Sequence, residues 1–189
     1  MIGNIPLSSC CAGQAVELMA PLLAGGETCL QIGARSKEGF TRFEGPLESL
    51  GFKHFDILEV FPGNVDTLRA LDIDTRFVVC GDVRDLGKSA LGLPPSHDLI
   101  IWWHGPEHVV RHAFLDVLPV LRSRCKTLLV GCPNGFYEQG ALYGNHYEHH
   151  VYHWKPEELE ALGFRVYTCG SGEPDKQEHM FGFMEGEAG

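Results

Sequence analysis

A repeated alternation of short apolar runs with amphipathic segments is the feature that most constrains the fold of this chain. Five of the apolar runs are strand candidates, at residues 27–33, 54–60, 75–80, 97–103 and 126–132. The segments between them carry apolar side chains at helical spacing, as at Phe40, Phe43 and Leu47. Strands that are apolar almost throughout, with helices between them, are typical of a parallel sheet covered on both faces. The sequence therefore predicts a three-layer α/β fold.

Composition narrows the kinds of partner that this protein can have. A chain of 189 residues that is 44% hydrophobic can bury a sizeable core in one domain. Its formal charge of −10, without a basic run, argues against a large nucleic-acid interface, which relies on Lys and Arg. No apolar run reaches the roughly 20 residues that cross a bilayer, and the N-terminus lacks signal-peptide features. The expectation is a cytoplasmic protein with reduced thiols that binds neither nucleic acid nor membrane.

The alternating pattern stops after Pro133. Residues 133–154 are rich in Gly, Asn, Tyr and His and show neither helical nor strand period. A long irregular segment in a compact domain is often functional. Regularity returns with a helix beginning near Pro156 and two final strands, at 165–170 and 179–185. We expect a single domain over residues 1–189 with an irregular insertion at about 133–154.

Glycine and polar residues stand where the expected strands end. The first four strands are followed or ended by Gly33, Glu59, Asp82 and His104, in that order. In an open parallel sheet, ligands bind beyond the carboxyl ends of the strands. A carboxylate ending the second strand can accept from both hydroxyls of an adenosine ribose, as proposed for Glu59. Asp82 can accept from an adenine amino group, with the Val83 amide facing the ring.

These residues carry a resemblance to a known family, together with the segments DILEVFPGNVDTL, VVCGDVRDL, DLIIWWHGPEHV and CPNGFYEQGALYGN. Over about residues 15–185, the sequence resembles class I S-adenosylmethionine-dependent methyltransferases. The resemblance implies a mostly parallel, seven-stranded Rossmann-like sheet with an antiparallel last strand, and S-adenosylmethionine lying across the first two strands. By matching position, the donor would be bound by Gly33 and Ala34 at the methionine part, Glu59 at the ribose, Asp82 and Val83 at the adenine, and His104 near the sulfonium.

The loop after the first strand departs from the family pattern. An acidic residue usually stands two positions before the first glycine, and two further glycines follow at alternate positions. This chain has Gln31, and then Arg35 and Lys37. Gln31 removes a charge that would attract the donor's ammonium group, and the two cations can come near the cationic sulfonium. Gly39 comes late enough for the loop to be longer.

Three functions are consistent with these observations. The sequence favours methyl transfer from S-adenosylmethionine, with S-adenosylhomocysteine as product, to a small-molecule or glycan-like acceptor. The departure in the loop keeps open a non-catalytic binding or scaffold protein that has lost the donor. A dinucleotide oxidoreductase gains from Arg35 and Lys37, which suit phosphates, and loses because the G-x-G-x-x-G pattern is absent.

Histidines supply the two candidate catalytic residues. His104 follows the fourth strand, and His150 follows a Gly-Asn turn, as a histidine does in similar sequences. Either can act as a general base if the acceptor must lose a proton. The string HGPEH matches a zinc motif that needs an unbroken helix, but Pro106 suits the start of a helix instead. Surface histidines are the alternative for the cluster at 146–153, and no metal site is predicted.

Overall fold

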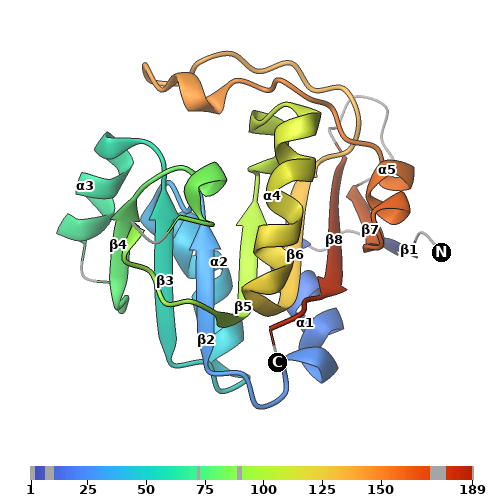
Figure 1. Cartoon of the computed structure of the whole chain (residues 1–189). Helices are drawn as coiled ribbons and strands as arrows, with labels where there is room; N and C mark the ends of the chain where they lie inside the picture. The colour runs from blue at the N-terminus through green and yellow to red at the C-terminus, as the bar shows by residue number, and fades with distance from the viewer. Residues whose placement is uncertain (1–2, 7–10, 72, 89–90, 171–177, 189) are drawn as a thin grey trace.

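A single mixed sheet organises the computed structural model, which describes residues 3–6, 11–71, 73–88, 91–170 and 178–188 (Figure 1). Its strands are β1 (Gly3–Pro6), β2 (Thr28–Ile32), β3 (His54–Glu59), β4 (Phe77–Cys80), β5 (His97–Trp103), β6 (Cys125–Pro133), β7 (Arg165–Gly170) and β8 (His179–Glu185). They lie in the order β1-β7-β8-β6-β5-β2-β3-β4. β8 runs antiparallel to both of its neighbours, and the other pairs are parallel. The seven expected strands and the antiparallel last strand are confirmed, and the edge strand β1 is an addition.

Helices cover both faces of the sheet and complete the three layers (Figure 1). They are α1 (Cys11–Leu23), α2 (Lys37–Glu48), α3 (Pro62–Ala70), α4 (Arg111–Ser123) and α5 (Pro156–Ala161). One apolar core joins α1, α2 and α3 to one face, and a second joins α4 and α5 to the other. Phe40, Phe43 and Leu47 are buried on α2, as their spacing predicts.

None of the helices in the described part of the chain is long and apolar enough to span a membrane.

The helix expected from Pro106 is broken into two pieces. Pro106–His108 forms a single 3-10 turn, η3, and α4 begins only at Arg111. Val109 and Val110 between them have extended backbone, with ψ of 145° and 148°. Proline is compatible with the first position of such a turn, where its missing N–H is not needed. The break leaves the polar residues of η3 at the carboxyl edge of the sheet.

A disulfide at Cys169 departs from the expectation of reduced thiols. Among the other cysteines whose side chains the structure describes, Cys29, Cys80, Cys125 and Cys132 are free. Burial raises the pKa of the Cys125 thiol to about 12, so this group behaves as a small apolar residue.

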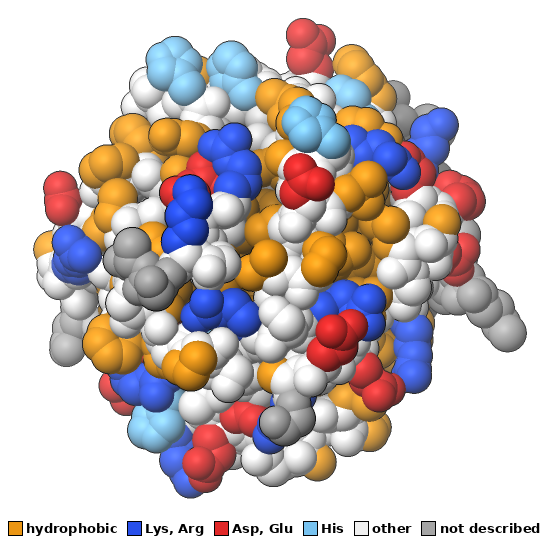
Figure 2. Space-filling view, viewed as in Figure 1, with side chains coloured by type: hydrophobic (Ala, Val, Ile, Leu, Met, Phe, Trp, Pro, Cys, Tyr) orange, Lys and Arg blue, Asp and Glu red, His pale blue; other side chains and the backbone are white. Residues whose placement is uncertain are grey.

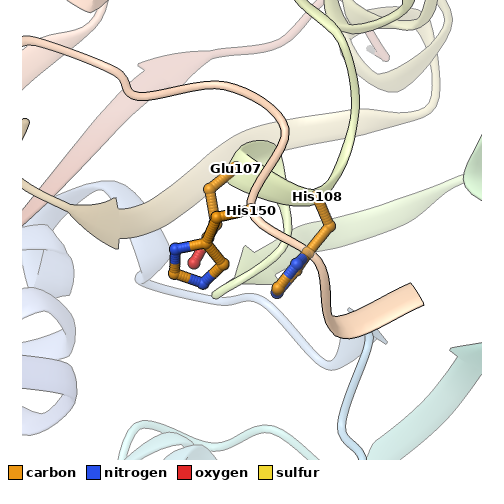
Figure 3. Close-up of side chains that lie close together, drawn as sticks. All are labelled: Glu107, His108 and His150. Carbon is orange, nitrogen blue, oxygen red and sulfur yellow. The ribbon is translucent and has the colours of Figure 1, made fainter. Parts of the chain in front are cut away.

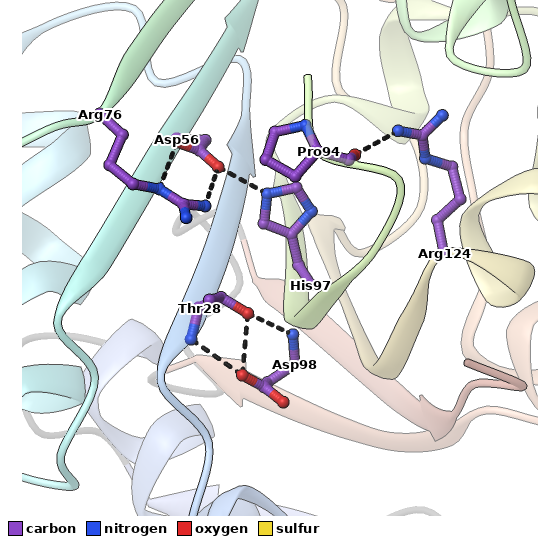
Figure 4. Close-up of polar contacts among 7 residues, drawn as sticks. All are labelled: Thr28, Asp56, Arg76, Pro94, His97, Asp98 and Arg124. Atoms are coloured by element: carbon purple, nitrogen blue, oxygen red, sulfur yellow. Dashed lines mark hydrogen bonds and ion pairs between the residues drawn. The ribbon is translucent and has the colours of Figure 1, made fainter. Parts of the chain in front are cut away.

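Asp98 of β5 bonds to both neighbouring strands, β2 and β6, at the end of the sheet opposite their carboxyl ends; Figure 4 shows its contacts with Thr28. Its Oδ2 accepts from the amides of Glu27 and Thr28, both at 2.9 Å, and from the Thr28 hydroxyl at 2.8 Å. Lys126 of β6 lies 2.7 Å from the other carboxylate oxygen. Burial alone would raise the pKa of Asp98, but these donors outweigh it and hold the pKa well below its usual range.

A second carboxylate is fully buried in the same region. Asp56 of β3 accepts two hydrogen bonds from the Arg76 guanidinium, and its Oδ2 lies 2.7 Å from Nε2 of His97 (Figure 4). Burial raises the pKa of Asp56, and the bonds from His97 and Arg76 reverse the shift and lower it. The pairing therefore keeps a charge inside the sheet and fixes β3 against β5.

We expect the Asp98 interactions to make stability depend on pH. Because the folded-state pKa lies below the unfolded value of about 3.9, their contribution is complete above that pH. It is lost as the pH falls through the folded-state pKa. In urea unfolding, Asp98→Asn should therefore be less stable than the parent at pH 7, and the gap should narrow between pH 5 and pH 2.5. A gap that stays constant over this range would contradict the assignment.

Candidate functional site

A cleft of about 630 Å³ opens at the carboxyl ends of β2, β3, β4 and β5. The segment 134–155 crosses above this edge of the sheet, and histidine side chains gather along the same edge of the surface (Figures 1 and 2). Apart from an isolated bridge between Leu142 and Asn145, this segment has only the short 3-10 turn η4 (His146–Glu148) as regular structure. We call residues 134–155 the insertion, since β6 ends at Pro133 and α5 begins at Pro156, one residue later at each end than the sequence indicates. The residues expected at the site that line the cleft are Gly33, Glu59, Asp82, Val83, His104 and His150. Ala34 does not line it; its side chain is buried in the core.

The loop between β2 and α2 keeps a glycine-like backbone although it has only one glycine. Gly33 has φ of +73° and Arg35 has φ of +60°, so both are left-handed. For Arg35 this conformation costs about 1–2 kcal/mol, because its Cβ crowds the next carbonyl. The Arg35 amide donates to Oε2 of Glu59 at 3.0 Å. Arg35 therefore has a left-handed backbone that glycine would adopt without this strain, and the hydrogen bond to Glu59 stabilises it.

Gln31 and Gly39 join this loop to α2. Gln31 is buried at the end of β2, and its Nε2 donates to the Gly39 carbonyl at 2.8 Å. A Cβ on Gly39 would lie 2.0 Å from the Ala34 carbonyl oxygen. Gly39 therefore does not lengthen the loop, as its position in the sequence suggested. It lies in the first turn of α2, where it allows the helix to contact the loop, and Ser36 caps the helix by accepting from its amide.

Glu59 is only 3% exposed, yet it borders the cleft. One carboxylate oxygen accepts from Arg35, and the other accepts from the Phe61 amide at 3.0 Å. Each oxygen of a carboxylate can accept about two hydrogen bonds. Both oxygens of Glu59 can therefore accept from a ligand without breaking the bonds that position the side chain.

Asp82 lies at the neighbouring strand end and is already paired. It caps the 3-10 turn η1 (Val83–Asp85), because Oδ1 accepts from the Arg84 amide at 2.8 Å and from Arg84 Nε at 2.9 Å. Burial raises the pKa of Asp82, but the hydrogen bonds from Arg84 outweigh it and lower the pKa. A ligand at this end of the cleft would meet a carboxylate that shares its charge with a guanidinium.

The side chain of Arg35 connects the β2–α2 loop to the insertion. Its Nε lies 3.5 Å from Oε1 of Glu148, and its guanidinium lies 5.9 Å from the centre of the Tyr143 ring. Glu148 is itself mostly buried, with 15% of its side chain exposed. The positive charge that the sequence places in this loop is therefore paired with a carboxylate. Lys37 is exposed at the start of α2.

The chain turns sharply after β5. His104 has φ of +49°, and its amide donates to the Gly131 carbonyl at 2.7 Å. Its ring meets that of His179 edge to face, with centres 5.2 Å apart. Burial, and then the neighbouring His104, lower the pKa of His179. A Cβ on Gly105 would lie 1.8 Å from Nε1 of Trp102, so only glycine fits between this ring and the turn.

Glu107, His108 and His150 converge at this end of the cleft (Figure 3). One possible ligand atom from each lies within 4.8 Å of the other two. Glu107 is 2% exposed, and its Oε2 has no hydrogen-bond partner in the described part of the chain. The Glu107 carbonyl accepts from the amides of Val151 and Tyr152, at 2.9 and 3.1 Å. η3 and the insertion are therefore bonded to each other where these side chains meet.

Sequence reasoning selected only His150 from this group. The HGPEH string holds the other two residues, but as a zinc motif it requires an unbroken helix, which Pro106 disfavours. A single 3-10 turn brings Glu107 and His108 to the cleft instead. The third residue, His150, belongs to the insertion, about 40 positions later in the sequence. The useful signal was an adjacent Glu-His pair directly after a buried strand.

Comparison with solved structures places the fold. The methyltransferase domain of bacterial CtHen1 matches with a TM-score of 0.62 at 16% identity, over 92% of this chain and 96% of that one. A S-adenosylmethionine-dependent methyltransferase from Clostridium acetobutylicum matches with a TM-score of 0.63 at 9% identity, over 94% and 91%. The plantazolicin methyltransferase BpumL, solved with S-adenosylhomocysteine, matches with a TM-score of 0.61 at 12% identity, over 93% and 83%. No family profile and no curated protein sequence matches the chain.

These likenesses agree with the sheet order. The molecule is a Rossmann-like α/β protein with a cleft at the carboxyl ends of its parallel strands. More specifically, it has the class I methyltransferase fold, with the expected antiparallel last strand.

We expect Gly39→Ala to destabilise the protein by about 1–3 kcal/mol, the usual cost of overpacking. A glycine-to-alanine change inside a helix normally stabilises it by about 1 kcal/mol, so the sign is reversed by the contact with Ala34. Gly13→Ala is a matched control, because Gly13 is the third residue of α1 as Gly39 is of α2, and open space surrounds its Cβ position. Urea unfolding of the two variants checks this, and stabilisation by both would refute the close approach.

Proposed function

We propose that this protein is a methyltransferase that binds S-adenosylmethionine in the cleft and transfers the methyl group to an acceptor under the insertion. The observation that carries the proposal is Glu59, a nearly buried carboxylate at the end of β3 whose oxygens can still accept from a ligand. Two adjacent hydroxyls of a ribose are the donors that suit such a group. The class I methyltransferase fold supports the same ligand at this position.

The rest of the donor would extend to both sides of Glu59. Asp82 and Val83 border the cleft on the β4 side and suit the adenine. Gly33 borders it on the β2 side and suits the methionine part. Ala34 is buried, so its contribution is to the shape of the loop, where its carbonyl accepts from the Ser36 amide at 2.6 Å.

The backbone and contacts of the β2–α2 loop are more favourable to donor binding than its amino-acid sequence suggests. The non-catalytic alternative rested on the replacement of family glycines by Arg35 and Lys37. Arg35 nevertheless keeps the left-handed backbone, and Glu148 offsets its charge. We therefore favour an enzyme over a scaffold that has lost its donor.

Transfer would proceed by in-line displacement at the methyl carbon. The carbon–sulfur bond breaks as a bond to an acceptor oxygen or nitrogen forms, and neutral S-adenosylhomocysteine leaves. Positioning alone can supply up to about 7–11 kcal/mol of acceleration in such reactions. If the acceptor carries a proton, His104 or His150 can take it, since both line the cleft. Burial lowers the pKa of His150, which favours the neutral, proton-accepting ring.

The insertion suits a small-molecule or glycan-like acceptor. Tyr137 and Tyr147 line the cleft and are 41% and 49% exposed, so their rings can contact a flat or sugar-like surface. The net charge of −10 disfavours a polyanionic acceptor.

We expect Glu59→Gln to weaken S-adenosylmethionine binding at least about tenfold, because a charge-assisted bond to a ribose hydroxyl is lost. Glutamine keeps one acceptor for the Arg35 or Phe61 amide, so it disturbs the loop less than alanine would. Isothermal titration calorimetry on the variant and on Asp116→Asn, an exposed carboxylate of α4, measures the effect. Equal affinity in Glu59→Gln and the parent would remove the ribose assignment.

The Arg35–Glu148 pair gives a prediction on charge. Glu148→Gln should leave Arg35 unpaired and weaken binding of the cationic donor by about threefold, an ordinary size for a screened charge. Binding of S-adenosylhomocysteine, which lacks the sulfonium charge, should change less.

The double variant Arg35→Ala, Lys37→Ala should bind S-adenosylmethionine as tightly as the parent or more tightly. A loss above tenfold in that variant, with weaker salt dependence, would indicate a phosphate ligand instead.

A further inference from the structure

We propose that Glu107, His108 and His150 form a binding site for a divalent transition-metal ion, at the end of the cleft formed by η3 and the insertion. All three line the cleft, and each offers one ligand atom within 4.8 Å of the others (Figure 3). Two independent features of the described residues support a cation here. One is the orientation of the imidazoles, and the other is the state of the carboxylate.

The backbone fixes which ring nitrogen each histidine presents. Nδ1 of His108 lies 3.0 Å from the His149 carbonyl, and Nδ1 of His150 lies 2.7 Å from the Tyr137 carbonyl. A carbonyl oxygen only accepts, so Nδ1 must carry the proton in both rings. In the neutral imidazole, Nε2 then has a free lone pair. Donation from the second ring nitrogen to a carbonyl is the arrangement that orients metal-ligating histidines.

The carboxylate of Glu107 lacks a strong positive partner among the described residues. Glu107 is buried, and its Oε2 accepts no hydrogen bond from any described residue. Oε1 has only a long contact of 3.4 Å with Nδ1 of His104. A buried carboxylate is costly unless it is paired or coordinates a metal. A cation between Glu107 and the two Nε2 atoms would supply that partner.

The ligand set selects the kind of ion. Two imidazoles and one carboxylate suit Zn²⁺, Mn²⁺, Fe²⁺, Co²⁺ or Ni²⁺, whereas Mg²⁺ and Ca²⁺ prefer oxygen alone. Ligands bound at about 2.1 Å from one ion lie at most about 4.2 Å apart. The three ligand atoms lie within 4.8 Å of one another, so any adjustment that binding requires is small, and the rings of His108 and His150 are only half-buried.

The role that we give the ion rests on the proposed methyl transfer. With three protein ligands, such an ion would keep capacity for a further ligand, and a hydroxyl oxygen of an acceptor in the adjoining cleft could supply it. Coordination lowers the pKa of a bound hydroxyl. His104 would then take its proton as the oxygen attacks the methyl carbon, because His150 is occupied by the ion. The acceptor class is thereby narrowed to molecules that present a hydroxyl group.

Metal titration of the full chain tests the site without any donor. Chelator-treated protein is titrated with Co²⁺, followed by absorbance, and with Zn²⁺, Mn²⁺ and Mg²⁺ by calorimetry. We expect one transition-metal ion per chain and much weaker Mg²⁺ binding. Glu107→Gln, His108→Ala and His150→Ala should each weaken binding by about a hundredfold or more, since even loss of residues behind the ligands costs about 10- to 100-fold. His112→Ala, an exposed histidine on α4, should leave affinity unchanged.

Two further measurements make the outcome decisive. Nitrogen-15 spectra of the histidine rings should show the Nε2 signals of His108 and His150 shifting with Zn²⁺, while their Nδ1 atoms stay protonated. Circular dichroism of each variant, with the half-buried His150→Ala as the mildest change, separates lost binding from lost folding. Absence of transition-metal binding in the parent, or an equal loss in His112→Ala, would overturn the proposal. Donor binding to the same protein is measured separately. Metal binding without donor binding would refute only the proposed function, and donor binding without metal binding would refute only the metal site.

Discussion

The carboxylate of Glu59 is the group on which the geometry of the cleft depends. It accepts from the amides of Arg35 and Phe61, and so it joins the loop after β2 to the turn before α3. Without it, the Arg35 amide would lose the hydrogen bond that helps to offset the strain of its left-handed backbone. The same two bonds also aim the carboxylate, so the side chain that organises the loop is the one best placed to bind a ligand.

The two ends of the cleft differ in how they are built. Near Glu59, the polar groups come from strand ends and are hydrogen-bonded within a rigid sheet. Near Glu107, they come from a 3-10 turn and from the insertion, and a buried carboxylate oxygen is without a partner in the described part of the chain. The end near Glu59 is already hydrogen-bonded in place, which suits the methyl donor that we propose for it. The end near Glu107 has a buried carboxylate oxygen without a partner among the described residues, which suits the metal ion that we propose there.

Sequence patterns were enough for the sheet and for one end of the cleft. Apolar runs mark β2, β3, β5 and β6 because buried parallel strands need apolar side chains on both faces. Glu59 and Asp82 could be placed beside the cleft because strand ends meet at one edge, and the ligands that they would bind stay predictions. Glu107 could not be placed beside His150 from the sequence, because that depends on a contact between η3 and the insertion, and no local period records such a contact. β1 was missed because its four residues, paired only with β7, are too few to show a pattern.

The backbone of Glu107 adds a thermodynamic consequence. Its carbonyl accepts from the amides of Val151 and Tyr152, so the residue whose side chain faces the cleft also anchors the segment that crosses above it. Any ligand that favours this position of Glu107 also favours the anchored insertion. By linkage, the anchored state gains RT ln(1 + [L]/Kd), about 2.7 kcal/mol at a hundredfold excess over Kd. Detachment of the insertion would then weaken the binding of such a ligand by the same factor by which the ligand stabilises its attachment.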